Sequence, residues 1–183
     1  MAGAILAGGA GRRVNGADKG LLDWRGKPLI EHVVARIAPQ VDSLVISANR
    51  NRDNYAQFGY PVLADRVAGY PGPLAGIAAA LAVAPHEWLL CVPVDLPLLP
   101  LDLAARLLQA AIAHGTTVAV AHDGQHRQSL CALLKGTLAA SASASLARGD
   151  GAVWAWQDAC GVVEVDFSDQ PDAFTNLNSF APG

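Results

Sequence analysis

The fold of this protein is decided by a stretch near its start: Ala4-Ile5-Leu6-Ala7-Gly8-Gly9-Ala10-Gly11-Arg12-Arg13. The apolar residues 4–7 predict a short buried strand, and the glycines after them predict a loop at its end. Glycines let backbone N–H groups approach a ligand closely, and a loop of this kind binds anions. Arg12, Arg13 and then Lys19 add positive charge. The stretch therefore predicts a loop that binds a phosphate chain.

Two common phosphate loops do not fit. A Walker loop requires Gly-Lys followed by Ser or Thr, and this stretch has no such triplet. A dinucleotide fingerprint that starts at Gly9 would need a third glycine where Val14 stands. The simpler alternative is an ordinary strand-to-helix turn with two arginines on the surface. We favour a phosphate loop of another kind, because glycines and cations crowd one short segment.

The composition indicates a globular protein. The 183 residues fit one domain, residues 1–183, and a hydrophobic fraction of 52% argues against disorder. A net charge of −3 disfavours a protein that coats nucleic acid or a membrane surface. The start of the chain lacks the basic segment of a signal peptide, and the apolar stretch Pro73 to Pro85 is too short to span a bilayer. We expect a cytoplasmic protein with neither nucleic acid nor membrane as a partner.

The spacing of the cysteines and histidines does not match a metal-binding motif. Cys91, Cys131 and Cys160 are odd in number and far apart, so reduced thiols in the core are the expected state. The segment His122 to His126 contains turn-forming residues and predicts a turn between strands.

Strand-like and helix-like segments alternate along the chain. Continuous apolar runs predict strands at residues 41–48, 87–94, 116–121 and 130–134. Helical patterns occur at residues 29–37, 74–84, 103–112 and 137–146. This alternation predicts an α/β fold with a mostly parallel sheet and helices on both faces. Ligands of such folds bind beyond the carboxyl ends of the strands, where the Gly8 loop and Asp95 are expected.

Asp95 is the candidate metal ligand. It follows the strand predicted at residues 87–94 and lies between Pro93 and Pro97. Mg²⁺ takes one or two carboxylates and completes its shell with phosphate oxygens and water, so a lone carboxylate there suits it. The alternative is that Asp95 caps the following helix.

Two further clusters are candidates for ligand contacts. Residues 69–76 form a second glycine loop that enters a helix, and the carboxylate of Asp65 before it could accept hydrogen bonds from a guanine edge. The alternative is a structural turn. Asn176 and Asn178 place two amides on one face of an extended segment, where they contact a ligand or hold the tail.

Taken together, these motifs resemble the molybdenum cofactor guanylyltransferases, also called molybdopterin-guanine dinucleotide synthases. The resemblance runs in order from about residue 4 to residue 178 and rests on six motifs: residues 6–13, residues 18–21, residues 26–29, residues 72–76, Asp95-Leu96-Pro97 and Asn176-Leu177-Asn178.

The resemblance implies a Rossmann-like nucleotidyltransferase fold and a Mg²⁺-dependent reaction. The terminal phosphate of Mo-molybdopterin attacks the α-phosphorus of GTP, and pyrophosphate leaves; molybdoenzyme apo-proteins or their chaperones are further possible partners. Carried onto this chain, the catalytic residues are Arg13, Lys19 and Asp95, with Asp95 on the metal. The nucleotide site comprises Leu6, Ala7, Gly8, Gly9, Lys19, Ser47, Asp65, Gly76 and Asp95. Asn176 and Asn178 lie toward the pterin.

The chain also departs from the family pattern. Val14-Asn15 stands where relatives often have Met-Gly, and Ser47 stands where some carry Asn. Relatives tend to carry arginines near residues 149–152, where this chain has Arg148 nearby. Two alternatives stay open: a molybdopterin cytidylyltransferase, which usually reads Leu-Ala-Ala-Gly in the first loop, and a non-catalytic carrier of nucleotide or cofactor.

Overall fold

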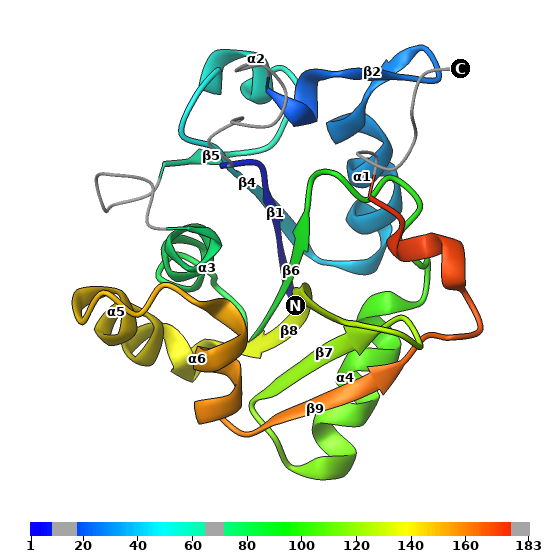
Figure 1. Cartoon of the computed structure of the whole chain (residues 1–183). Helices are drawn as coiled ribbons and strands as arrows, with labels where there is room; N and C mark the ends of the chain where they lie inside the picture. Colours follow the sequence, from blue (N-terminus) through cyan, green and yellow to red (C-terminus); the bar gives the residue numbers. More distant parts are fainter. Residues whose placement is uncertain (9–17, 65–71, 177–183) are drawn as a thin grey trace.

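A central sheet organises the computed structural model, which describes residues 1–8, 18–64 and 72–176 (Figure 1). In this described part the sheet has seven strands in the order β5-β4-β1-β6-β8-β7-β9. Neighbouring strands are parallel, except that β8 is antiparallel to both β6 and β7. The strands are β1 Ala2–Leu6, β4 Ser43–Ser47, β5 Val62–Leu63, β6 Trp88–Pro93, β7 Val118–His122, β8 Arg127–Lys135 and β9 Val162–Asp166. The mostly parallel sheet predicted from the sequence is confirmed.

Helices cover both faces of this sheet, as predicted. Helices α1 (Leu29–Ile37) and α4 (Leu103–His114) pack on one face in a core that contains Ile5, Leu90 and Val92. Helices α3 (Pro73–Leu81), α5 (Ala139–Ala147) and α6 (Val153–Ala159) pack on the other face, against Ala4 and Cys91. Alternate residues of β1 and β6 thus point into two separate cores, which is why the sequence of these strands is apolar without a break.

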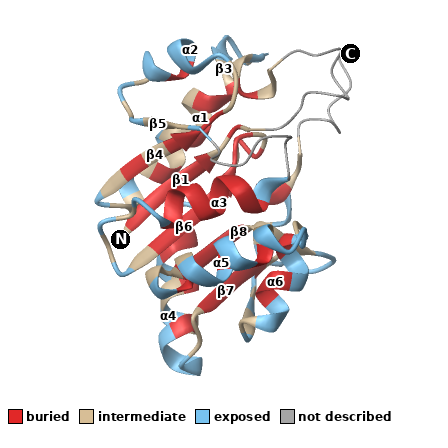
Figure 2. Ribbon diagram, turned by 90° about the vertical axis from the view of Figure 1, so that its left-hand side faces the viewer, coloured by how far each residue is buried: buried red, intermediate tan, exposed pale blue. Residues whose placement is uncertain are grey.

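The helices differ in how deeply they are buried (Figure 2). Every residue of α3 from Leu74 to Leu81 is buried, whereas α5 buries Ala142 and Ser145 and exposes most of its other residues. These two helices overlap the helical patterns predicted at residues 74–84 and 137–146. Helix α3 ends at Leu81, before the predicted end at residue 84, because the last predicted residues form a turn.

Short elements connect the larger ones. A hairpin of β2 (Asp23–Trp24) and β3 (Lys27–Pro28) precedes α1, and α2 (Arg52–Ala56) joins β4 to β5. The turn between β2 and β3 places Arg25 and Gly26 at φ values of 54° and 81°. Two consecutive left-handed residues are typical of a two-residue hairpin turn. The described 3₁₀ helices are η1 Lys19–Leu21, η2 Ala38–Gln40, η3 Gly136–Leu138 and η4 Pro171–Phe174.

The turn predicted at residues 122–126 joins β7 to β8. The Asp123 carboxylate accepts hydrogen bonds from the backbone N–H groups of Gln125 at 2.8 Å and His126 at 2.7 Å. Gly124 lies at a φ of 94°, which a side chain rarely adopts. Local hydrogen bonds of this kind explain why turn residues gather here.

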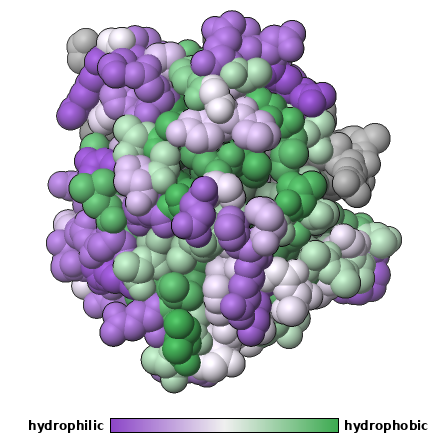
Figure 3. Space-filling model, turned by 180° about the vertical axis from the view of Figure 1, so that it is seen from behind, coloured by the Kyte–Doolittle hydropathy of each residue, from purple (hydrophilic) through white to green (hydrophobic). Residues whose placement is uncertain are grey.

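The surface mixes hydrophilic and hydrophobic residues, as the view from behind shows (Figure 3). Large apolar side chains are exposed at positions from five separate parts of the chain: Leu22, Val83, Leu101, Ile112 and Trp154. Scattered residues of this kind are normal for a folded protein. Among the described helices, none combines the length and the apolar character that crossing a membrane requires.

Candidate functional site

The candidate site lies where the parallel strands end. The register pairs Leu6, the last residue of β1, with Ser47 of β4 on one side and with Pro93 of β6 on the other. Two hydrogen bonds continue beyond the strands: Ala7 N–H donates to the Ser47 carbonyl at 2.8 Å, and Val94 N–H donates to the Leu6 carbonyl at 3.1 Å. The carboxyl ends of the three strands therefore form one edge, as expected for a ligand site in this class of fold.

Helix α3 approaches this edge closely at Gly76. A Cβ atom at Gly76 would lie 2.7 Å from the Ser47 hydroxyl oxygen and 3.3 Å from Leu6 Cδ2. Any side chain at Gly76 would push the helix away from the ends of β1 and β4. The helix begins after Gly72, whose φ of 94° suits glycine, and Pro73 occupies its first turn. Gly76 thus sets the distance between α3 and the strand ends.

Asp95 lies at the same edge, just beyond β6, with 16% of its side chain exposed. Lys19 Nζ lies 3.2 Å from its Oδ2 oxygen, and the Asn176 amide nitrogen donates to the same oxygen at 2.8 Å. Three segments that are far apart in the sequence meet at this one carboxylate. Asp95 does not cap the following helix, because α4 begins after Asp102. Its side chain instead contacts Lys19 and Asn176.

Lys19 is presented by the 3₁₀ helix η1, which is capped by Asp18. The Asp18 carboxylate accepts hydrogen bonds from Gly20 N–H at 3.3 Å, from the Asn51 amide at 3.1 Å and from the Tyr55 hydroxyl. Asn51 and Tyr55 were not among the sequence candidates. Asn51 adopts a left-handed conformation with a φ of 49°, in which asparagine is common. An asparagine in the sequence can therefore suggest a turn at this position, but it does not reveal Asp18 as a partner more than thirty residues away.

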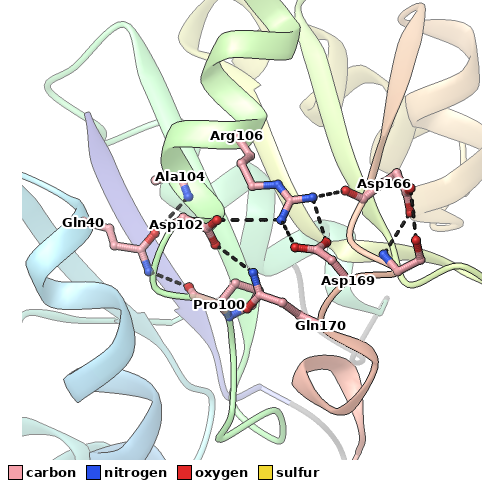
Figure 4. A network of polar contacts seen from close by, with 9 residues as sticks. Gln40, Pro100, Asp102, Ala104, Arg106, Asp166, Asp169 and Gln170 are labelled. Atoms are coloured by element: carbon pink, nitrogen blue, oxygen red, sulfur yellow. Dashed lines mark hydrogen bonds and ion pairs between the residues drawn. The ribbon is translucent and has the colours of Figure 1, made fainter.

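Asn176 reaches Asp95 from the segment that follows β9. Figure 4 shows how Arg106 of α4 ties this segment down, with its guanidinium on both carboxylate oxygens of Asp169 at 2.9 and 3.0 Å and on the Asp166 carbonyl. The same guanidinium stacks on the Phe167 ring at 3.9 Å, and Gln170 donates to Asp102 at 3.2 Å. The C-terminal segment is thus fastened to the start of α4 a few residues before Asn176.

The start of α4 is fastened in turn to the first half of the chain (Figure 4). The Gln40 amide donates to the Pro100 carbonyl at 2.8 Å and accepts from Ala104 N–H at 2.9 Å. This satisfies one of the backbone donors that the first turn of a helix leaves free. The elements around Asp95 therefore form one connected frame.

The donor set at Asp95 suits a magnesium ion that a phosphate-bearing ligand brings with it. Both side-chain contacts fall on Oδ2, and within the described residues Oδ1 has no hydrogen-bond partner. No group of three His, Cys, Asp or Glu in residues 1–8, 18–64 and 72–176 is placed to hold a metal. A single carboxylate with phosphate oxygens and water is the kind of shell that Mg²⁺ takes. The metal prediction for Asp95 is therefore consistent with the donors present.

Two of the three thiols, those of Cys91 and Cys131, are poor nucleophiles in this fold. Cys91 and Cys131 are buried and Cys160 is half-buried, and all three are free. Burial raises the pKa of Cys91 to about 12, and burial beside Asp95 raises the pKa of Cys131 as well. Since the thiolate is the reactive form, these two cysteines belong to the core and not to the chemistry, in agreement with the sequence analysis.

The structure brings together several of the predicted site residues and leaves others undescribed. Leu6, Ala7, Gly8, Ser47, Gly76 and Asp95 lie at or against the same strand ends, and Lys19 and Asn176 contact Asp95. Gly9, Arg13, Asp65 and Asn178 lie outside the described residues.

Comparison with known proteins gives a consistent result. The family described as the MobA-like NTP transferase domain matches residues 3–161. A protein from Shewanella loihica named molybdenum cofactor guanylyltransferase is 47% identical over 175 residues, which cover 96% of this chain and 89% of that protein. One of the same name from Photobacterium profundum is 46% identical with the same coverage of both chains, 96% and 89%.

Solved structures agree on the fold. Molybdopterin-guanine dinucleotide biosynthesis protein A from Archaeoglobus fulgidus superposes with a TM-score of 0.81, covering 97% of this chain and 92% of that one, at 22% identity. A nucleotidyl transferase from Methanothermobacter thermautotrophicus gives a TM-score of 0.72, covers 97% and 91% of the two chains, and is 18% identical. At these identities the likeness shows a shared nucleotidyltransferase fold.

Proposed function

Because this chain belongs to the MobA-like NTP transferase family, and within it to the molybdenum cofactor guanylyltransferases, we propose that it transfers GMP from GTP to Mo-molybdopterin. A phosphate oxygen of Mo-molybdopterin forms a bond to the α-phosphorus of GTP. The bond from that phosphorus to the bridging oxygen breaks, and pyrophosphate leaves with the electron pair. The products are molybdopterin guanine dinucleotide and pyrophosphate. Residues 1–183 would act as one nucleotidyltransferase domain.

The observation that carries this proposal is the contact between Lys19 and Asp95 at the strand ends. An attacking phosphate is already ionised, so the reaction needs alignment and charge neutralisation more than a general base. Lys19 would bind the triphosphate and the departing pyrophosphate, helped by Arg13. Leu6, Ala7, Gly8 and Gly9 would line the nucleotide site with Ser47 and Gly76, and Asp65 would accept from the guanine edge.

Asp95 would hold a Mg²⁺ ion, which when bound supplies further positive charge at the phosphate oxygens. The Asn176 amide, 2.8 Å from Asp95 Oδ2, would orient that carboxylate, and Asn178 would lie toward the pterin. Lys19 and Asn176 both place hydrogen-bond donors on Oδ2 and so fix the direction in which the carboxylate points. We propose a cytoplasmic location, with molybdoenzyme apo-proteins or their chaperones as recipients of the product.

The test is a turnover assay with purified protein, Mo-molybdopterin, Mg²⁺ and either GTP or CTP. We expect pyrophosphate release and dinucleotide formation with GTP, and little of either with CTP. Asp95→Ala should abolish turnover while the protein stays folded. The matched control is Glu87→Gln, which removes a carboxylate just before the other end of β6, where Glu87 pairs with Lys135.

Three results would overturn the proposal. Preference for CTP would favour a cytidylyltransferase. Binding of GTP without any pyrophosphate release would favour a carrier. Full activity of Asp95→Ala would remove this carboxylate from the mechanism.

A further inference from the structure

Tyr55 is a buried residue close to the candidate site, and the proposed reaction does not use it directly. It is the buried residue of the short helix α2 and is 0% exposed. Its ring belongs to the core on the α1 and α4 face of the sheet, while its hydroxyl donates a hydrogen bond to the carboxylate of Asp18. Burying a hydroxyl in an apolar core costs free energy unless the hydroxyl makes a hydrogen bond, and for Tyr55 the Asp18 carboxylate is the acceptor.

Asp18 passes this restraint to Lys19 through the backbone. Asp18 directly precedes Lys19 and accepts a hydrogen bond from Gly20 N–H on Oδ1, the oxygen that Tyr55 also contacts. The carboxylate therefore holds the first turn of η1, and Asn51 holds its other oxygen at 3.1 Å. Burial, together with the neighbouring Asp18 carboxylate, raises the pKa of Tyr55, so the hydroxyl keeps its proton and remains a donor.

Gly20 shows how closely η1 rests on this support. A Cβ atom at Gly20 would lie 2.4 Å from the Tyr55 hydroxyl oxygen and 2.9 Å from Val94 Cγ2. Val94 is the residue before Asp95, so the backbone of η1 is wedged between Tyr55 and the strand end that carries the carboxylate. Tyr55 thus touches η1 twice: through Asp18 and through Gly20.

We propose that Tyr55 is a positioning residue, which holds Asp18 and η1 so that the Lys19 ammonium group lies beside Asp95. The inference rests on the proposed function, in which Lys19 binds the triphosphate. Small displacements of a charged group from its substrate are expensive, since a shift of about 1 Å can cost as much as 100-fold in rate. Tyr55→Phe removes the hydroxyl and keeps the ring, so it is the variant that tests this role.

The experiment is a double-mutant cycle of Tyr55→Phe and Lys19→Ala, read by turnover and by the dissociation constant for GTP. We expect Tyr55→Phe to lower kcat about tenfold and to weaken GTP binding. In the Lys19→Ala background the same substitution should change both quantities by less than about twofold, because the group that it positions is gone. Tyr60→Phe is the matched control, since it makes the same chemical change at a half-buried tyrosine five residues along, and it should leave both quantities within about twofold of the wild type.

The cycle separates a positioning role from a purely structural one. If Tyr55 served stability alone, its substitution would cost the same in both backgrounds, and that additive result would overturn the inference, as would wild-type values for Tyr55→Phe. All assays are run well below the melting temperature of each variant. The GTP arm also distinguishes the two proposals: wild-type protein that binds GTP but transfers nothing to Mo-molybdopterin contradicts the proposed function, while the GTP cycle still decides the role of Tyr55.

Discussion

Two supports converge on Asp95, and they are built differently. Lys19 comes from the first part of the chain, and its support is interior: Tyr55 is 0% exposed and its hydroxyl holds Asp18. Asn176 is the last described residue, and its support includes the ion pair between Arg106 and Asp169 (Figure 4). This pair is at the surface, since the two side chains are 26% and 60% exposed. Asp95 is thus contacted by two side chains: Lys19, which depends on the part-buried hydrogen bond between Tyr55 and Asp18, and Asn176, which depends on the solvent-exposed ion pair between Arg106 and Asp169.

The difference predicts which support controls activity. A hydrogen bond in the interior fixes geometry because water cannot replace the lost partner. Exposed ion pairs contribute little, typically about 0–1 kcal/mol, because water and salt compete with them. We therefore expect the Lys19 side to govern catalysis and the Arg106 side to adjust stability.

The largest effect is expected from Lys19→Ala. Removing one charge-stabilising donor typically costs about 10²-fold in turnover or more, and Lys19 lies 3.2 Å from Asp95 at the proposed phosphate site. The measurement is steady-state pyrophosphate release with saturating GTP. Lys27→Ala is the control, since Lys27 pairs with Glu31 on the surface of α1, and it should retain wild-type turnover. Normal activity in Lys19→Ala would contradict the expectation that the Lys19 side of Asp95 governs catalysis.

How far the sequence leads can be judged at these same residues. The strands around Leu6, residues 43–47 and residues 88–93 were predictable because both faces of the sheet are covered, which leaves long apolar runs. Lys19 and Asp95 were identified separately, Lys19 from the chemistry of the glycine loop and Asp95 from its position after a predicted strand, and the family resemblance added a role for each. Their contact spans 76 positions, and no local pattern encodes it.

Other parts were not predicted, for physical reasons. The edge strand β9 buries neither face fully, so Val162 to Asp166 lack a continuous apolar run. The antiparallel placement of β8 between β6 and β7 depends on how the chain crosses the sheet, which hydrophobic periodicity does not record. Tyr55 lies on a five-residue helix, too short for a periodic signal, and its role becomes visible only when Asp18 is placed beside it.

A smaller effect is expected from Asn176→Ala. It removes the amide that donates to Asp95 at 2.8 Å but leaves Lys19 in place, so kcat/KM should fall about tenfold, the scale of one hydrogen bond to a charged group. Asn176→Asp should be worse than Asn176→Ala, because a second carboxylate would then face Asp95. The measurement is kcat/KM of both Asn176 variants, compared with that of Lys19→Ala. If Asn176→Ala and Lys19→Ala lowered kcat/KM equally, the two side chains that contact Asp95 would be equally important for activity.

The smallest effect on activity is expected from Arg106→Gln, which should act on stability instead. Losing the stacking of Arg106 on Phe167 costs about 1 kcal/mol, which lowers Tm by roughly 2–4 °C in a protein of this size, while turnover well below Tm stays within about threefold. Arg148→Gln, which breaks a surface pair with Asp150, is the control. A fall in turnover as large as that of Lys19→Ala would show that the exposed support is as critical as the buried one.

The acid dependence of this variant sharpens the comparison further. The Arg106 guanidinium, which hydrogen-bonds Asp169, lowers the pKa of that carboxyl below its ordinary value. A lowered folded-state pKa stabilises the protein above the unfolded pKa, about 3.9, and the stabilisation is lost as the pH falls through the folded pKa. Urea unfolding at pH 7, 5 and 3 should therefore show a constant gap between wild type and Arg106→Gln at the two higher values and a narrower gap at pH 3. A gap that stays constant down to pH 3 would mean that the ion pair contributes nothing and that the other contacts of Arg106, with the Phe167 ring and the Asp166 carbonyl, account for its effect on stability.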